Sequence, residues 1–196
     1  MGTHSKNEQN TDVRIRQALY DILCEKKIED TCVSEIADRA GISRRSFYAY
    51  YKDKYDAVEA IFKELFAKYI GEPKPMTFQY FYIHMDPLMA ENTAFLKNTI
   101  YFNGQNSLEN AFSELIQNIF YQILDDNGWN RNADPNNLCS NACNIFSHSI
   151  IRLMYIDISN YKYDSAVYNE ATKKNLISGA EVLKSLTPVI LTKYFF

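Results

Sequence analysis

Two adjacent arginines and a tyrosine stand close together in one short segment of the chain. Arg44, Arg45 and Tyr48 lie three or four residues apart, so in a helix their side chains share one face. A guanidinium group can pair with the O6 and N7 edge of guanine in the major groove, and a tyrosine hydroxyl can donate to a phosphate. Duplex DNA is therefore a chemically suitable ligand. An arginine pair taken alone is more often a solvated helix face, so the surrounding segment decides.

That segment has the pattern of two short helices around a tight turn. Apolar residues at helical spacing precede Gly41, whose backbone freedom suits the turn that ends the first helix. Ser43 can accept a hydrogen bond from the free amides of the next turn, which predicts a second helix over residues 44–50. The apolar positions of the first helix are Val33, Ile36, Ala37 and Ala40. The pattern is that of a helix-turn-helix, and it favours the DNA interpretation of the arginines.

A longer helix follows at once. Asp53 is suited to cap it, with Asp56 in a box-like arrangement, and Lys54 stands in its first turn. A helix N-terminus together with an ammonium group can hold an anion such as a phosphate, although Lys54 can also simply face solvent. We expect this helix to run for about 17 residues. Two closely spaced prolines within residues 71–75 end it and mark a domain boundary.

Residues 31–54 resemble the DNA-binding region of the TetR/AcrR family of transcriptional regulators. That region has the form T-x-V-x-x-IA-x-x-AG-[VI]-S-x-x-[ST]-[FL]-Y-x-[HY]-F-x-x-K, and the resemblance extends over roughly residues 11–66. Three positions depart from the family: Cys32 stands where a second threonine often caps, Tyr51 where phenylalanine is usual, and Ala57 where leucine usually packs. The matching positions are Thr31, Val33, Ile36, Ala37, Ala40, Gly41, Ile42, Ser43, Ser46, Phe47, Tyr48, Tyr50 and Lys54.

The pattern along the chain, together with the resemblance, predicts an all-α chain with three parts. These are a disordered N-terminus (1–10), a three-helix helix-turn-helix domain with a bridging helix (11–70), and a helical effector and dimerisation domain (71–196). The resemblance further implies a homodimer that represses transcription at a palindromic operator and is released by a small-molecule effector. The residues expected to contact DNA are Thr31, Ser34, Ser43, Arg44, Arg45, Ser46, Tyr48, Ala49, Tyr50 and Lys54.

Beyond residue 75 the apolar spacing predicts further helices and no strands. A weaker resemblance links residues 89–108, with their E-N-x-x-F-L element before an N-G turn, to the Firmicutes-type effector domain of the same family. A tryptophan-containing segment common in that branch is replaced here by residues 154–157. The predicted helices are 77–92, which Pro87 is expected to kink or restart, 93–102, 108–125, 136–159 and 164–185.

Aromatic side chains in this half of the chain are candidates for lining an effector pocket that suits a small apolar or aromatic ligand. A helical domain rich in phenylalanine and tyrosine can equally be filled by its own rings, so a core without a cavity stays open as an alternative. The candidates are Phe78, Phe81, Tyr82, Phe95, Tyr101, Phe112, Phe120 and Phe146.

Composition limits the remaining classes of function. The 196 residues are 46% hydrophobic, enough for a buried core, and the formal charge is −3. Residues 1–70 hold 12 basic and 12 acidic side chains, so DNA binding would depend on local cations instead of a general basic field. No stretch is apolar enough to span a membrane and the N-terminus has no signal core, so we expect a cytoplasmic protein.

The sequence also speaks against an enzyme and against a metal protein. It has three histidines and no repeated acidic motif, so we expect no catalytic site and no cofactor. Cys139 and Cys143 share a helix face near His148, but this spacing is poor for zinc, and core packing of reduced thiols is the expectation. A DNA-binding or protein-interaction module without an effector remains the second functional class.

Overall fold

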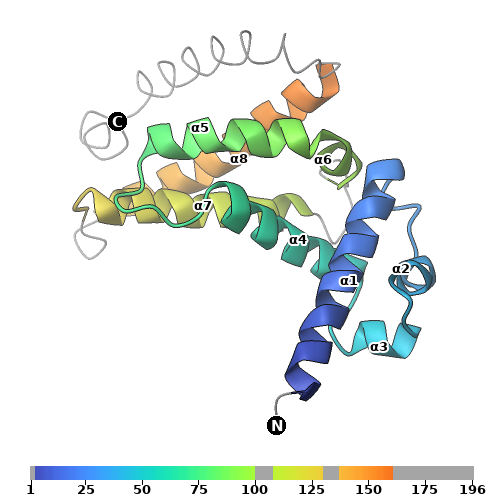
Figure 1. The fold of residues 1–196 in the computed structure, drawn as a ribbon. Helices are drawn as coiled ribbons and strands as arrows, with labels where there is room; N and C mark the ends of the chain where they lie inside the picture. Colours follow the sequence, from blue (N-terminus) through green and yellow to red (C-terminus); the bar gives the residue numbers. More distant parts are fainter. Residues whose placement is uncertain (1–2, 100–107, 130–136, 161–196) are drawn as a thin grey trace. The chain divides into compact units, whose positions relative to one another are not determined.

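The computed structural model describes residues 3–99, 108–129 and 137–160, and its regular elements there are all α-helices, which confirms the expected fold class. Figure 1 shows their order along the chain. The helices are α1 (Thr3–Glu25), α2 (Val33–Ala40), α3 (Arg44–Tyr48), α4 (Lys54–Tyr69), α5 (Phe78–Glu91), α6 (Thr93–Thr99), α7 (Leu108–Asp126) and α8 (Leu138–Asn160). The predicted helix 164–185 lies outside the described residues.

The chain divides into two compact units. The N-terminal unit comprises residues 1–65 and 94–111, and the C-terminal unit comprises residues 66–93 and 112–196. These units differ from the predicted domains, because α6 joins the first unit from the middle of the chain. Two helices, α4 and α7, each begin in the N-terminal unit and end in the C-terminal unit.

Helix α1 supplies one side of the core of the N-terminal unit. The apolar spacing predicts a helix from about Asp12 to Lys26 with a stripe that lies over the helix-turn-helix, and this stripe is confirmed, since every member is at most 4% exposed. α2 and α3 lie together on one side of α1 (Figure 1). The helix begins at Thr3 instead of near Asp12, so residues 3–10 are helical where disorder was expected. No proline or glycine interrupts that polar segment, which removes the local obstacle to a longer helix. The stripe consists of Ile15, Ala18, Leu19, Ile22 and Leu23.

Helix α6 completes the core of the N-terminal unit. Phe95 is fully buried, its ring stacked 5.0 Å from that of Tyr20 on α1 and edge-on at 5.4 Å from that of Phe62 on α4. The Asn98 side chain donates to the Leu23 carbonyl at 2.8 Å, and the Asn98 carbonyl accepts from the amide of Ile28 at 3.1 Å. Phe95 was expected to line an effector pocket in the other half of the chain. The structure instead places this ring in the N-terminal unit, against α1 and α4, and its role in lining a pocket stays a prediction.

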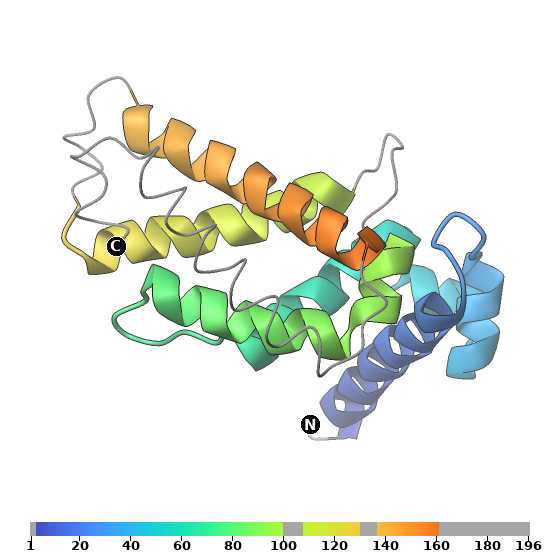
Figure 2. The ribbon, with the colours of Figure 1, turned by 90° about the horizontal axis from the view of Figure 1, so that it is seen from above.

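Helices α5, α7 and α8 make up most of the described part of the C-terminal unit (Figure 2). Hydroxyl pairs join α7 to α8: Ser113 to Ser147 at 2.9 Å and Tyr121 to Ser140 at 2.8 Å. α5 continues through Pro87, so the helix does not restart there. None of the described helices combines the length and hydropathy that crossing a bilayer requires.

Replacing Phe95 with alanine should lower the free energy of unfolding by about 3–5 kcal/mol, because the removed ring leaves a cavity between α1, α4 and α6. Chemical denaturation followed by far-UV circular dichroism measures this change. Fluorescence of Trp129, the only tryptophan, is less suitable because that residue lies in the C-terminal unit.

Ile83→Ala is the control, since this α5 side chain is 58% exposed and its loss should change stability by no more than about 0.5 kcal/mol. If both variants were equally stable, Phe95 would not be a core residue of the N-terminal unit.

Candidate nucleic-acid interface

The turn between α2 and α3 is fixed by backbone hydrogen bonds around Gly41. This glycine has φ of 66°, its amide donates to the Asp38 carbonyl at 3.1 Å, and the next amide, of Ile42, donates to the Ala37 carbonyl at 2.9 Å. The two bonds form a Schellman motif, which needs a left-handed residue at this position. A Cβ added at Gly41 would also lie 2.8 Å from Nη2 of Arg14. Glycine is therefore required by the backbone conformation, whereas the Arg14 guanidinium, at the end of a flexible side chain, could shift to make room.

Helix α3 is short and is held at its start and in its middle. The Ser43 hydroxyl accepts the amide of Ser46 at 3.0 Å, which confirms Ser43 as the N-cap. Phe47 is fully buried and turns one face of the helix inward. The helix ends at Tyr48, with Ala49 as C-cap, two residues before the predicted end at residue 50. Turn-like hydrogen bonds from residues 49–51 to the carbonyls of Ser46 and Phe47 continue the chain beyond it.

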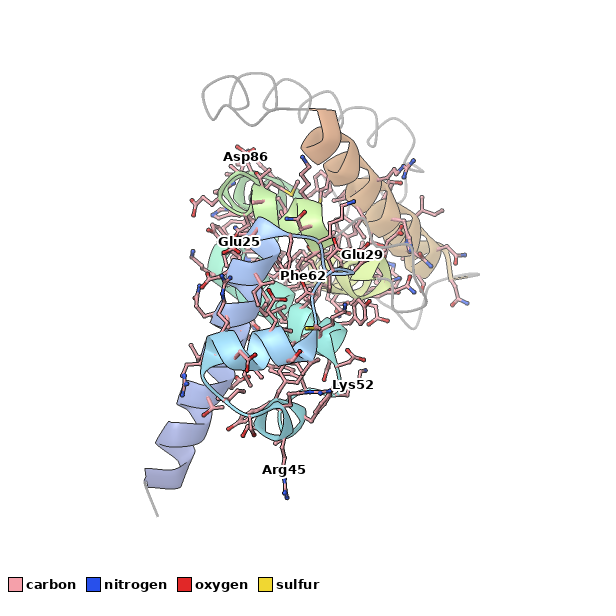
Figure 3. All side chains as sticks on the ribbon, turned by 90° about the vertical axis from the view of Figure 1, so that its right-hand side faces the viewer. Glu25, Glu29, Arg45, Lys52, Phe62 and Asp86 are labelled. Atoms are coloured by element: carbon pink, nitrogen blue, oxygen red, sulfur yellow. The ribbon has the colours of Figure 1, made fainter. Side chains whose placement is uncertain are left out.

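The opposite face of α3 carries the residues that could read DNA. Arg44 and Arg45 are exposed, and Tyr48 is 50% exposed while its ring edge packs on Phe47 at 5.6 Å. Figure 3 shows Arg45 pointing away from the protein beyond α3. Lys52, in the segment between α3 and α4, is exposed as well. The charged groups of these three cations have no hydrogen bond or ion pair within the described part of the chain.

Several other cations of this unit have partners inside it, and three of them lie close to the helix-turn-helix. The guanidinium of Arg14 donates to the carbonyls of Ala40 and, at 3.1 Å, Gly41, so it satisfies free acceptors at the C-terminus of α2. Arg16 binds Asp12 on α1 and, through Nε at 2.8 Å, Glu64 on α4. The third is Lys54.

Lys54, which was expected to contact a phosphate, binds backbone carbonyls of a loop. Its ammonium nitrogen lies 2.6, 3.3 and 2.7 Å from the carbonyl oxygens of Ile28, Glu29 and Thr31, all in the loop between α1 and α2. An ammonium group has three donors, so these acceptors occupy them all. Burial lowers the pKa of Lys54, and the nearby Glu29 carboxylate partly opposes that shift. The side chain clamps α4 to the loop instead of facing outward.

Two further predicted contact residues lie at the start of α2. Thr31 is only 3% exposed and its hydroxyl donates to the Lys27 carbonyl at 3.0 Å, so it neither caps α2 nor reaches a phosphate. Cys32 is the N-cap residue of α2 and forms no side-chain cap bond. Its thiol lies 2.9 Å from the hydroxyl of the half-exposed Ser34.

Asp53 and Asp56 form the expected cap of α4. Oδ1 of Asp53 accepts the amides of Tyr55 and Asp56, both at 2.9 Å, and the Asp56 carboxylate accepts the amide of Lys52 at 3.0 Å. The box therefore reaches one residue further back than the usual arrangement. It fixes the backbone that carries Lys52.

The remaining aromatic candidates for an effector pocket are mostly packed against one another. Phe120 is fully buried, with ring centroids 6.0 Å from Phe78, 5.6 Å from Phe81 and 6.2 Å from the half-buried Phe146. Phe112 is buried against Phe66 at 5.2 Å. Tyr101 lies outside the described residues, as does the side chain of Tyr82 on α5. Their roles as pocket-lining residues stay predictions. Within the described residues, no three histidine, cysteine or acidic side chains converge as a metal site.

Comparison with known proteins agrees with this geometry. Residues 17–61 match the model of the bacterial regulatory proteins of the tetR family. An HTH-type transcriptional regulator named YxbF, from Bacillus subtilis (strain 168), is 30% identical over 57 residues, which are 29% of this chain and 15% of that protein. The likeness to YxbF thus covers a small part of the relative, about the size of the helix-turn-helix region.

Solved structures share the fold over a greater length. The dihydroxyacetone kinase operon activator DhaS matches with a TM-score of 0.59 and 19% identity, over 88% of this chain and 97% of its own. NalD, the secondary repressor of the MexAB-OprM efflux pump in Pseudomonas aeruginosa, matches with a TM-score of 0.52 and 14% identity, over 88% of this chain and 96% of its own. The names of all three proteins are those of transcription regulators. Residues 17–61 therefore form an N-terminal domain of the tetR type, on a chain whose described elements are α-helices.

Proposed function

We propose that the chain regulates transcription by binding a palindromic DNA operator through α3 as a homodimer. The observation that carries the proposal is the outer face of α3, where Arg44, Arg45 and Tyr48 are exposed on a helix that Ser43 and Phe47 hold in place. Exposed arginines can read guanine edges, and Tyr48 can donate to a phosphate. We propose the cytoplasm as the location of the protein, because a regulator of this kind acts on chromosomal DNA.

The homodimer follows from the size of α3. A helix of five residues brings few side chains to base edges, so a single copy would bind weakly. Two copies related by a two-fold axis present two recognition helices to major grooves about one helical turn apart, roughly 34–36 Å. A palindromic operator has the same symmetry. We propose that α8 and the predicted helix 164–185 form the dimer interface, as the family resemblance implies.

The proposed effector is a small apolar or aromatic molecule that binds the C-terminal unit and releases DNA. Such a molecule must bind the DNA-free conformation more tightly than the DNA-bound one. We propose repression as the direction of control. NalD is named a repressor and DhaS an activator, so the fold serves both, and a reporter gene placed behind the bound operator decides the direction.

The packing of the phenylalanines favours a second candidate, an effector-independent DNA-binding or protein-interaction module. Phe120 is in ring contact with Phe78 and Phe81, as expected of a core that is filled by its own side chains. Thermal melting with a panel of planar aromatic compounds separates the two. A compound that both raises the melting temperature and weakens DNA binding supports the effector, and a panel without one favours the filled core.

Arg44→Ala and Arg45→Ala should each weaken binding to the operator by about 1–3 kcal/mol and relax its sequence preference, because each removes a bidentate donor to a base. Mobility-shift titration on a duplex that the wild-type protein enriches from a randomised library measures this loss.

Lys97→Ala is the matched control, since it removes an exposed cation from α6. Full affinity in both arginine variants would show that another surface meets the DNA.

Substitutions of two lysines near the start of α4 should distinguish a side chain that contacts DNA from one that stabilises the fold. Lys52→Met should leave stability within about 0.5 kcal/mol of wild type and lower the salt dependence of DNA binding by about one phosphate contact. Lys54→Met should leave the salt dependence unchanged and reduce the free energy of unfolding by about 1–3 kcal/mol, because loop carbonyls lose their donor.

Urea denaturation and titrations at several salt concentrations give both quantities for each variant. If Lys54→Met instead kept its stability and lost salt dependence, Lys54 would be the phosphate contact expected from the sequence.

A further inference from the structure

Tyr51 lies just beyond the end of α3 and is 7% exposed. Its amide donates to the Phe47 carbonyl at 3.1 Å, and its ring packs on the Phe47 ring with centroids 5.9 Å apart. A phenylalanine in its place could make both contacts. The hydroxyl group is therefore an addition whose role must be found in its own partners.

Both partners of the hydroxyl are on α1. It donates to the carboxylate of Asp12 and accepts from Nη1 of Arg16 at 3.2 Å. Burial and the hydrogen bond to Asp12 raise the pKa of Tyr51 to about 12, so the hydroxyl keeps its proton at neutral pH. The end of the recognition segment is thus attached to α1 by a permanent donor.

Arg16 extends the connection to α4. Its Nη1 binds Asp12 and its Nε donates to Oε2 of Glu64 at 2.8 Å. Burial alone would lower the pKa of Arg16, but hydrogen bonds with Tyr51, Asp12 and Glu64 outweigh it and raise the pKa. The guanidinium is planar and its donors have a fixed geometry, so it sets directions as well as distances. We name this group the polar lock; its members are Asp12, Arg16, Tyr51 and Glu64.

The polar lock gives the segment around α3 a directional attachment to another helix, which the other contacts of α3 do not provide. Burial of Phe47 is non-directional, and the cap at Ser43 acts only at the start of the helix. Within the described residues, the Tyr51 hydroxyl carries the side-chain hydrogen bonds that join residues 44–51 to another helix. Binding constellations need side chains held to about 0.5 Å and 10–20°, which a five-residue helix cannot ensure alone.

We propose that the polar lock sets the orientation of α3 on α1 and α4, and that the Tyr51 hydroxyl is a positioning group for base reading by Arg44 and Arg45. This inference rests on the proposed DNA-binding function. It concerns how precisely α3 is aimed, whereas the proposed function concerns which face of α3 meets the DNA.

The test compares Tyr51→Phe with wild type on two duplexes, one enriched by the wild-type protein from a randomised library and one of unrelated sequence. Affinity for the enriched duplex should fall by roughly tenfold, the factor for losing a hydrogen bond to a charged group. Affinity for the unrelated duplex and its salt dependence should not change, because the exposed cations remain. Tyr121→Phe, which removes a hydroxyl bonded to Ser140 in the C-terminal unit, should leave both affinities unchanged.

A second variant tests the connection through Arg16. Glu64→Ala removes the α4 acceptor, and because both changes act through the same guanidinium, the double variant should lose less affinity than the product of the single losses. Equal weakening of both duplexes in proportion to unfolded protein would reduce Tyr51 to a structural role and overturn the proposal. Independent losses in the double variant, or no loss in Tyr51→Phe, would overturn it too.

Amide hydrogen exchange provides a readout without DNA. Exchange of residues 44–51 should be roughly tenfold faster in Tyr51→Phe than in wild type or Tyr121→Phe, because the segment opens more often when its anchor is lost. If the wild-type protein enriched no duplex, the proposed function would fail. The exchange rate would still show whether the polar lock holds residues 44–51 in place. Unchanged exchange would overturn the lock even if DNA binding were established.

Discussion

A helix of five residues cannot hold its own orientation, and the N-terminal unit is built to meet that constraint. An isolated helix shorter than about 12–15 residues is marginal in water, so α3 depends on the structure around it. The Schellman turn at Gly41 directs the chain into α3, Ser43 caps the start of the helix, and the buried Phe47 anchors its inner face. Tyr51 then attaches the segment that follows to α1. The outer face can carry exposed arginines because none of them is needed to hold the helix.

The cations of this unit have two separate uses. Arg14, Arg16 and Lys54 find acceptors within the unit, at the C-terminus of α2, on α1 and α4, and in the loop after α1. Their hydrogen bonds hold elements of the unit together. Arg44, Arg45 and Lys52 are left exposed. This division explains how a chain with a formal charge of −3 can have a surface suited to an anionic polymer.

Local patterns in the sequence predicted much of this structure, whereas contacts between distant segments were not accessible from them. The apolar stripe of α1, the turn at Gly41 and the caps at Ser43 and Asp53 all depend on residues close in sequence, and these predictions were confirmed. The carbonyl contacts of Lys54 could not be predicted because its acceptors lie 23–26 residues away. Spacing shows which residues share a face but not which carbonyls approach it. The one local signal of the polar lock was Tyr51 itself, a departure from the family pattern.

The membership of α6 in the N-terminal unit has a consequence for biosynthesis. The unit is discontinuous, since residues 66–93 are translated between its two parts. At about 5–20 residues per second, the ribosome needs on the order of seconds to supply Phe95 after α4 has been made. During that interval the nascent chain has the rings of Tyr20 and Phe62 but not their partner, a state in which chaperones can bind it. A fragment ending after α4 would remain in this unfinished state permanently.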